Sequence, residues 1–192
     1  VAGDEIAFGT CGAVKPLLLA LEVACHRERL DADAATQLLL SPLGGLDSIQ
    51  LRRLGRALRA RRRGQAGTPR SSAELIRQAL TEPKLLAEAE PTPEVATAAG
   101  LAQLVDRCRR AVTSGATAHQ TLWLLWQGTT WPQRLTAALA AGPDQAGAAH
   151  RDLDAICALF DGAQRYDELS SGRGVPGFLA EVAAQQIPAD RT

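Results

Sequence analysis

The sequence predicts an all-α protein, an irregular multi-helix domain of about eight or nine helices. Apolar residues recur at the three- and four-residue spacing of amphipathic helices along most of the chain. Residues that cap helices, and prolines or glycines that end them, stand between these segments. No alternation of apolar and polar residues extends beyond a few positions, so we do not expect a sheet.

The first helices are expected before and after a turn near Pro42. An apolar stripe runs from Ala13 to Arg29, and Asp31 can cap a second helix that stops at Ser41-Pro42. A third helix follows Asp47, with Gln50 placed to complete a capping box, and continues to Arg63. Residues 31–63 therefore form an expected helix-hairpin-helix element, followed by a linker over residues 64–69.

The second half of the chain predicts six more helices. Ser71-Ser-Ala-Glu74 carries a second capping-box pattern and opens a helix that ends before Pro83. An exposed acidic, proline-rich loop is expected over residues 88–93. The remaining helices are expected at 94–114, at 118–128, from Trp131 onward, at 151–165 after a loop over 141–147, and at 177–186.

The two tryptophans of the 118–128 segment lie three residues apart on one helical face. We expect Trp123 and Trp126 to pack in the core, with base stacking as the alternative if they are exposed. Trp131, beside a proline at a helix start, is expected to be the surface aromatic.

Length and composition indicate one domain with a substantial core. The 192 residues are 46% hydrophobic but only 4% aromatic, so leucine, alanine and valine must build the core. No apolar run approaches the roughly 18–20 residues that cross a bilayer, and no signal peptide is visible. The four cysteines are scattered without a C-x-x-C pair, which favours reduced thiols and a cytoplasmic protein. Methionine is absent even at position 1, so we expect a segment of a longer protein.

The basic part of the hairpin is the most informative feature for function. Eight arginines and no acidic residue lie between Ser48 and Ala73, although the formal net charge of the chain is zero. Four of these arginines share one helical face: Arg52, Arg56, Arg59 and Arg63. The opposite, buried face is expected to consist of Leu51, Leu54 and Leu58.

Two interpretations of this hairpin stay open. The arginines can contact duplex phosphates, and Gly44 and Gly45 can let backbone N–H groups approach a phosphate. The arginines can equally form a solvated face, and the two glycines an ordinary tight turn between packed helices.

Three stretches in this order carry a family resemblance: VKPLLLALEV at 14–23, LLSPLGGLDS at 39–48, and HRDLDAICALF at 150–160 followed by GFLAEVA at 177–183. Together they resemble the 2B subdomain of superfamily 1 DNA helicases of the UvrD/Rep/PcrA type, and more closely AdnA-like helicase-nuclease subunits of actinobacteria. The second stretch is similar to the family hairpin N-x-P-x-R-G-I-G. Gly44 stands where that hairpin has its arginine, and Asp47 stands where it has its second glycine.

The resemblance implies an accessory domain of an ATP-dependent DNA helicase that acts in double-strand break repair. Residues 1–12 would be a loop or strand remnant leading from the preceding motor domain, and residues 13–192 would be the 2B-like domain. This domain would grip or orient duplex DNA near the junction with single strands and regulate the motor. The implied DNA-binding residues are Gly44, Gly45, Arg52, Arg56, Arg59 and Arg63.

No catalytic machinery is expected in this segment. The sequence lacks a P-loop or other ATPase motif, and its three histidines lie far apart, so we expect neither a metal site nor a cofactor here. ATP and magnesium would bind the motor domains of the parent chain, which would be the helicase. The implied partners are duplex DNA or its junction, the motor domains and a sister helicase-nuclease subunit, with no membrane.

Two other functions remain open at this point. The arginines can pair with acidic residues of a sister subunit or of the motor, which would make this a protein-interaction domain without direct DNA contact. A free-standing helical enzyme is the third reading, and it would require a pocket with perturbed acidic groups.

Overall fold

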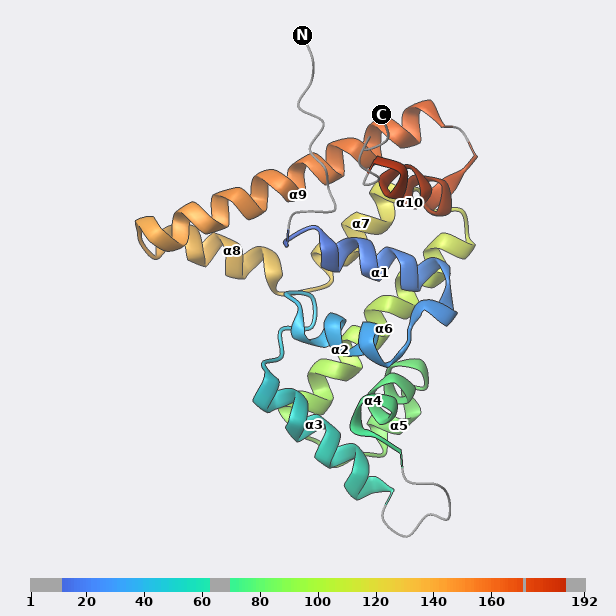
Figure 1. The fold of residues 1–192 in the computed structure, drawn as a ribbon, viewed down its shortest axis with the longest axis vertical. Helices are drawn as coiled ribbons and strands as arrows, with labels where there is room; N and C mark the ends of the chain where they lie inside the picture. The colour runs from blue at the N-terminus through green and yellow to red at the C-terminus, as the bar shows by residue number, and fades with distance from the viewer. Residues whose placement is uncertain (1–11, 63–69, 171, 186–192) are drawn as a thin grey trace, which may run out of the picture.

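The computed structural model describes residues 12–62, 70–170 and 172–185. These residues contain no strand, which confirms the predicted all-α class (Figure 1). Residues 1–11, and with them the predicted loop or strand remnant and Cys11, lie outside the described residues, as does the linker over 64–69. The elements in chain order are α1 (Lys15–Cys25), the short 3-10 helix η2 (Arg27–Arg29), α2 (Ala32–Leu40), α3 (Ser48–Arg61), α4 (Ser72–Thr81), α5 (Lys84–Ala87), α6 (Pro93–Thr113), α7 (Ala118–Gln127), α8 (Trp131–Ala140), α9 (Pro143–Leu169) and α10 (Gly174–Gln185).

Three predicted boundaries were wrong. The first helix ends at Cys25 instead of continuing to Arg29, because His26 adopts an extended backbone conformation. The helix predicted at 151–165 begins eight residues earlier, at Pro143, where proline suits the first helical position and alanines follow. The last helix begins at Gly174, three residues earlier than predicted, since its first turn tolerates Pro176. The described residues also include α5, a four-residue helix that the sequence did not indicate.

The helices pack around α1 and α6 (Figure 1). Helix α6 contacts α1, α3, α4, α5 and α7, while α9 packs against both α7 and α8. In Figure 1, α9 and α10 lie at one end of the molecule and α3, α4 and α5 at the other. The largest fully buried side chains are mainly leucines drawn from most of the helices, including Leu17, Leu21, Leu38, Leu39, Leu54, Leu104, Leu122, Leu125 and Leu159. The prediction of a leucine-rich core is confirmed.

The predicted roles of the tryptophans were wrong for two of the three. Trp131 is buried at 3% exposure and packs against Trp126, with ring centroids 5.6 Å apart. Trp123 is 48% exposed, because the buried positions of α7 are Ala118, Thr121, Leu122 and Leu125. Its ring instead meets the edge of Phe160 on α9 at a centroid distance of 6.0 Å.

Candidate nucleic-acid interface

The turn between α2 and α3 is held by its own backbone. The N–H of Gly45 donates to the carbonyl of Ser41 at 2.7 Å, and the N–H of Leu46 donates to the carbonyl of Leu39 at 3.0 Å. Gly45 has φ of +73°, which favours glycine. Gly44 is buried, and a Cβ there would lie 2.4 Å from the Leu39 carbonyl oxygen.

This geometry explains why the chain has glycine at both positions. The chain must pass close to the end of α2 at Gly44, and it must take a left-handed turn at Gly45. Because Gly44 is buried and the Gly45 N–H is already bonded, the exposed surface of the hairpin is provided mainly by the side chains of α3.

The start of α3 is fixed by the predicted capping box. The Oδ1 atom of Asp47 accepts the N–H groups of Ile49 at 2.8 Å and Gln50 at 2.7 Å. In return, the Gln50 side-chain oxygen accepts the N–H of Asp47 at 2.8 Å. Asp47 therefore caps the helix at the position where the resembled hairpin has a glycine.

The buried face of α3 differs slightly from the prediction. Leu54 and Leu58 are buried as expected, but Leu51 is only partly buried. Gly55 is buried beside them and faces α4, where a Cβ would lie 3.0 Å from the side chain of Ser72. The missing Cβ thus allows the α3 and α4 backbones to approach closely.

The start of α4 is capped by half of the predicted capping box. The Ser71 hydroxyl accepts the N–H of Glu74 at 3.2 Å. The carboxylate of Glu74 does not return to Ser71 but pairs with Arg77 at 2.7 Å. The hydrogen bond from Arg77 lowers the pKa of the Glu74 carboxyl.

One group of α3 arginines forms ion pairs with carboxylates of the same chain. Arg53 lies 3.5 Å from Glu94, which is only 5% exposed, and Arg61 pairs with Glu88. Hydrogen bonds from its own backbone N–H, from Thr92 and from Arg53 lower the pKa of the Glu94 carboxyl. We call Arg53 and Arg61 the paired arginines. The sequence did not indicate either pair, although Glu88 lies in the predicted acidic loop at 88–93 and Glu94 directly follows it.

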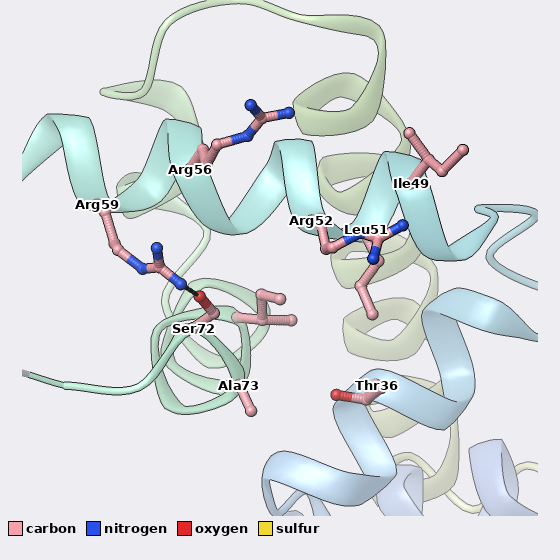
Figure 2. Close-up of a pocket in the computed structure, with 9 residues that line it drawn as sticks. Thr36, Ile49, Leu51, Arg52, Arg56, Arg59, Ser72 and Ala73 are labelled. Atoms are coloured by element: carbon pink, nitrogen blue, oxygen red, sulfur yellow. Dashed lines mark hydrogen bonds between the residues drawn. The ribbon is translucent and has the colours of Figure 1, made fainter.

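A second group of arginines lacks acidic partners. Arg52, Arg56 and Arg59 are exposed, and within residues 12–62, 70–170 and 172–185 none of them forms an ion pair with a carboxylate. We call them the free row. Arg59 donates a hydrogen bond to the hydroxyl of Ser72, as Figure 2 shows. Arg63, the fourth predicted member, lies outside the described residues.

The free row lines a groove of about 600 Å³ between α2, α3 and α4, which we call the arginine groove. In Figure 2, Ser72 of α4 points toward Arg59, and Leu51 of α3 points toward the side on which Thr36 of α2 lies. Its lining residues are Thr36, Ile49, Leu51, Arg52, Arg56, Arg59, Ser72, Ala73 and Ile76. The structure thus brings three predicted site residues together on one surface.

Comparisons with known proteins assign neither a family nor a function to this chain. In the described part of the chain, no helix is long and apolar enough to cross a bilayer. A scan against protein-family models and a search of curated proteins both gave no match to this chain.

Proposed function

We propose that this chain is an accessory domain of a superfamily 1, ATP-dependent DNA helicase that acts in double-strand break repair in the cytoplasm. It contacts the phosphates of duplex DNA near the junction through Arg52, Arg56 and Arg59. The free row is the observation that carries this proposal, because three exposed guanidinium groups without carboxylate partners remain available for an anionic ligand. The three-stretch resemblance to the 2B subdomain supports the helicase setting.

The dimensions of the free row suit a DNA backbone. Seven residues separate Arg52 from Arg59, which corresponds to about 10 Å along a helix. Each DNA strand carries one phosphate per roughly 3.4 Å of its axis, so the row spans about three phosphates. Contacts of this kind position a protein on DNA without reading its sequence, as a helicase requires.

The chemistry of unwinding belongs to other parts of the parent protein in this proposal. This segment carries no ATPase motif, so ATP and magnesium bind the motor domains. The role of this domain is to hold the duplex and to transmit its orientation to the motor.

The proposal is tested by fluorescence anisotropy of the 192-residue chain with a duplex that carries a single-stranded tail. Binding is measured over a salt series for the wild type and for a variant with Arg52→Glu, Arg56→Glu and Arg59→Glu. A matched control reverses three exposed arginines elsewhere, with Arg151→Glu, Arg165→Glu and Arg173→Glu. Both variants change the net charge equally, so a difference between them reports position.

We expect wild-type binding to weaken steeply with salt, with a slope near −0.9 for each phosphate contacted. The free-row variant should lose binding, whereas the matched control should keep most of it. Wild-type binding that is absent at low salt, or equally reduced in both variants, would refute a DNA-binding role for the free row.

A further inference from the structure

The floor of the arginine groove is apolar, which DNA phosphates do not explain. Leu51 and Ala73 are partly exposed in this floor, Ile76 beneath them is buried at 2% exposure, and Ile49 is a further lining residue with 53% of its surface exposed. A phosphate backbone can satisfy the guanidinium groups but covers little apolar surface. Exposed apolar surface bordered by charged residues is typical of a protein-binding site.

The charges around this floor have one sign. Arg52, Arg56 and Arg59 supply it, while the nearby Glu74 and Asp47 carboxylates are engaged by Arg77 and by the start of α3. The acidic segment of the chain itself, with Glu88 and Glu94, pairs with the other arginines of α3. The occupant that complements the groove therefore combines apolar side chains with carboxylates.

We propose that the arginine groove docks an amphipathic acidic helix of a protein partner. Its apolar residues, spaced at i, i+3 or i+4, and i+7, cover the exposed parts of Ile49, Leu51 and Ala73. Its flanking carboxylates pair with the free row. Ten residues separate Ile49 from Arg59, about 15 Å along α3, so the groove accommodates roughly three turns of a partner helix.

This inference goes beyond the proposed DNA contact and does not depend on it. Because both ligands use the free row, a bound acidic helix excludes the duplex from the same arginines. The partner would then regulate DNA binding by occupying the groove.

The test uses a fluorescein-labelled helical peptide with leucines on one face and glutamates flanking them. A control peptide has the same composition, with the leucines distributed around the helix. Both are titrated with the wild-type 192-residue chain and with three variants that preserve every arginine. Ile49→Ser removes apolar surface from the groove, Ala73→Gln fills its floor, and Leu40→Ser is the matched control, an exposed leucine (43%) outside the groove lining.

We expect the amphipathic peptide to bind at least tenfold more tightly than its rearranged control. Ile49→Ser and Ala73→Gln should each weaken peptide binding about tenfold, leave the affinity for tailed duplex unchanged and leave the circular dichroism spectrum native. Leu40→Ser should change neither affinity. Unlabelled amphipathic peptide should also displace the duplex in competition.

The docking proposal would be overturned if the two peptides bound equally, or if Ile49→Ser and Ala73→Gln left peptide affinity unchanged. Either result would mean that the peptide binds the arginines by electrostatic attraction alone. Duplex binding without amphipathic-peptide binding would overturn this inference alone. Peptide binding without duplex binding would support it and refute only the proposed DNA contact.

Discussion

Helix α3 carries two groups of arginines, and they differ in whether they form ion pairs within the chain. Arg53 and Arg61 form ion pairs with Glu94 at the start of α6 and with Glu88 before it. Arg52, Arg56 and Arg59 line the arginine groove, and in the described residues they form no ion pair with a carboxylate. An arginine-rich helix is thus not uniformly a ligand surface, because neighbouring helices decide which charges remain available.

The largest expected effect is a loss of stability on truncating a buried leucine that anchors α3 to the core. Leu54→Ala deletes a side chain with 0% exposure. We expect the free energy of unfolding to fall by about 3 kcal/mol, since a buried leucine loses both transfer energy and packing. Urea denaturation followed by circular dichroism measures this change. A loss below about 1 kcal/mol would show that α3 is not anchored through this residue.

A second prediction separates the two groups directly. The double variant Arg52→Gln, Arg56→Gln should weaken binding to tailed duplex about tenfold at low salt, through the loss of two phosphate contacts. Its stability should stay within about 0.5 kcal/mol of the wild type, because both side chains are exposed.

The matched double variant Arg53→Gln, Arg61→Gln should show the opposite pattern. It breaks both internal ion pairs, so it should lower the melting temperature more than the first variant while largely keeping DNA affinity. Anisotropy and thermal denaturation of the two proteins provide the comparison. If the two variants had the same DNA affinity and the same melting temperature, the paired arginines and the free row would not differ in function.

A smaller effect is expected at the start of the helix that both groups share. Asp47→Ala removes the acceptor of two N–H groups and half of the capping box. The expected loss of stability is about 1 kcal/mol, measured by urea denaturation. Asp47→Asn should recover most of it, because asparagine is also a good N-cap; failure of this rescue would assign the effect to charge.

The smallest effect should come from releasing one paired arginine. Glu94→Gln frees Arg53 and should strengthen duplex binding two- to threefold at low salt, as expected for about one further phosphate contact. The pKa of Glu94 is lowered from 4.5 in the folded protein, so its stabilising contribution is complete above pH 4.5 and is lost as the pH falls through the lowered value.

Acid denaturation of Glu94→Gln should therefore depend less on pH below 4.5 than that of the wild type. Parallel acid titrations of the two proteins, followed by circular dichroism, test this difference. Superimposable curves would show that the Glu94 carboxylate, which accepts hydrogen bonds from its own backbone N–H, from Thr92 and from Arg53, contributes nothing to acid stability.

Local interactions explain why much of the fold could be predicted. The all-α class, the N-caps at Asp31 and Asp47 and the stop after Leu40 depend on residues within four positions of one another. The start of α9 at Pro143 falls in a segment predicted as loop, and α5 has only four residues, too few for an apolar periodicity to indicate a helix.

The sequence by itself determined that α3 is a capped, amphipathic and arginine-rich helix, since spacing and capping are properties of adjacent residues. Only the tertiary structure decided which arginines are free, that Trp123 is exposed and Trp131 buried, and that Gly44 is packed against Leu39. Each of these outcomes depends on contacts between distant segments, such as Arg53 with Glu94, 41 residues apart. Helical periodicity fixes which side chains share a face, but it does not specify what packs against that face.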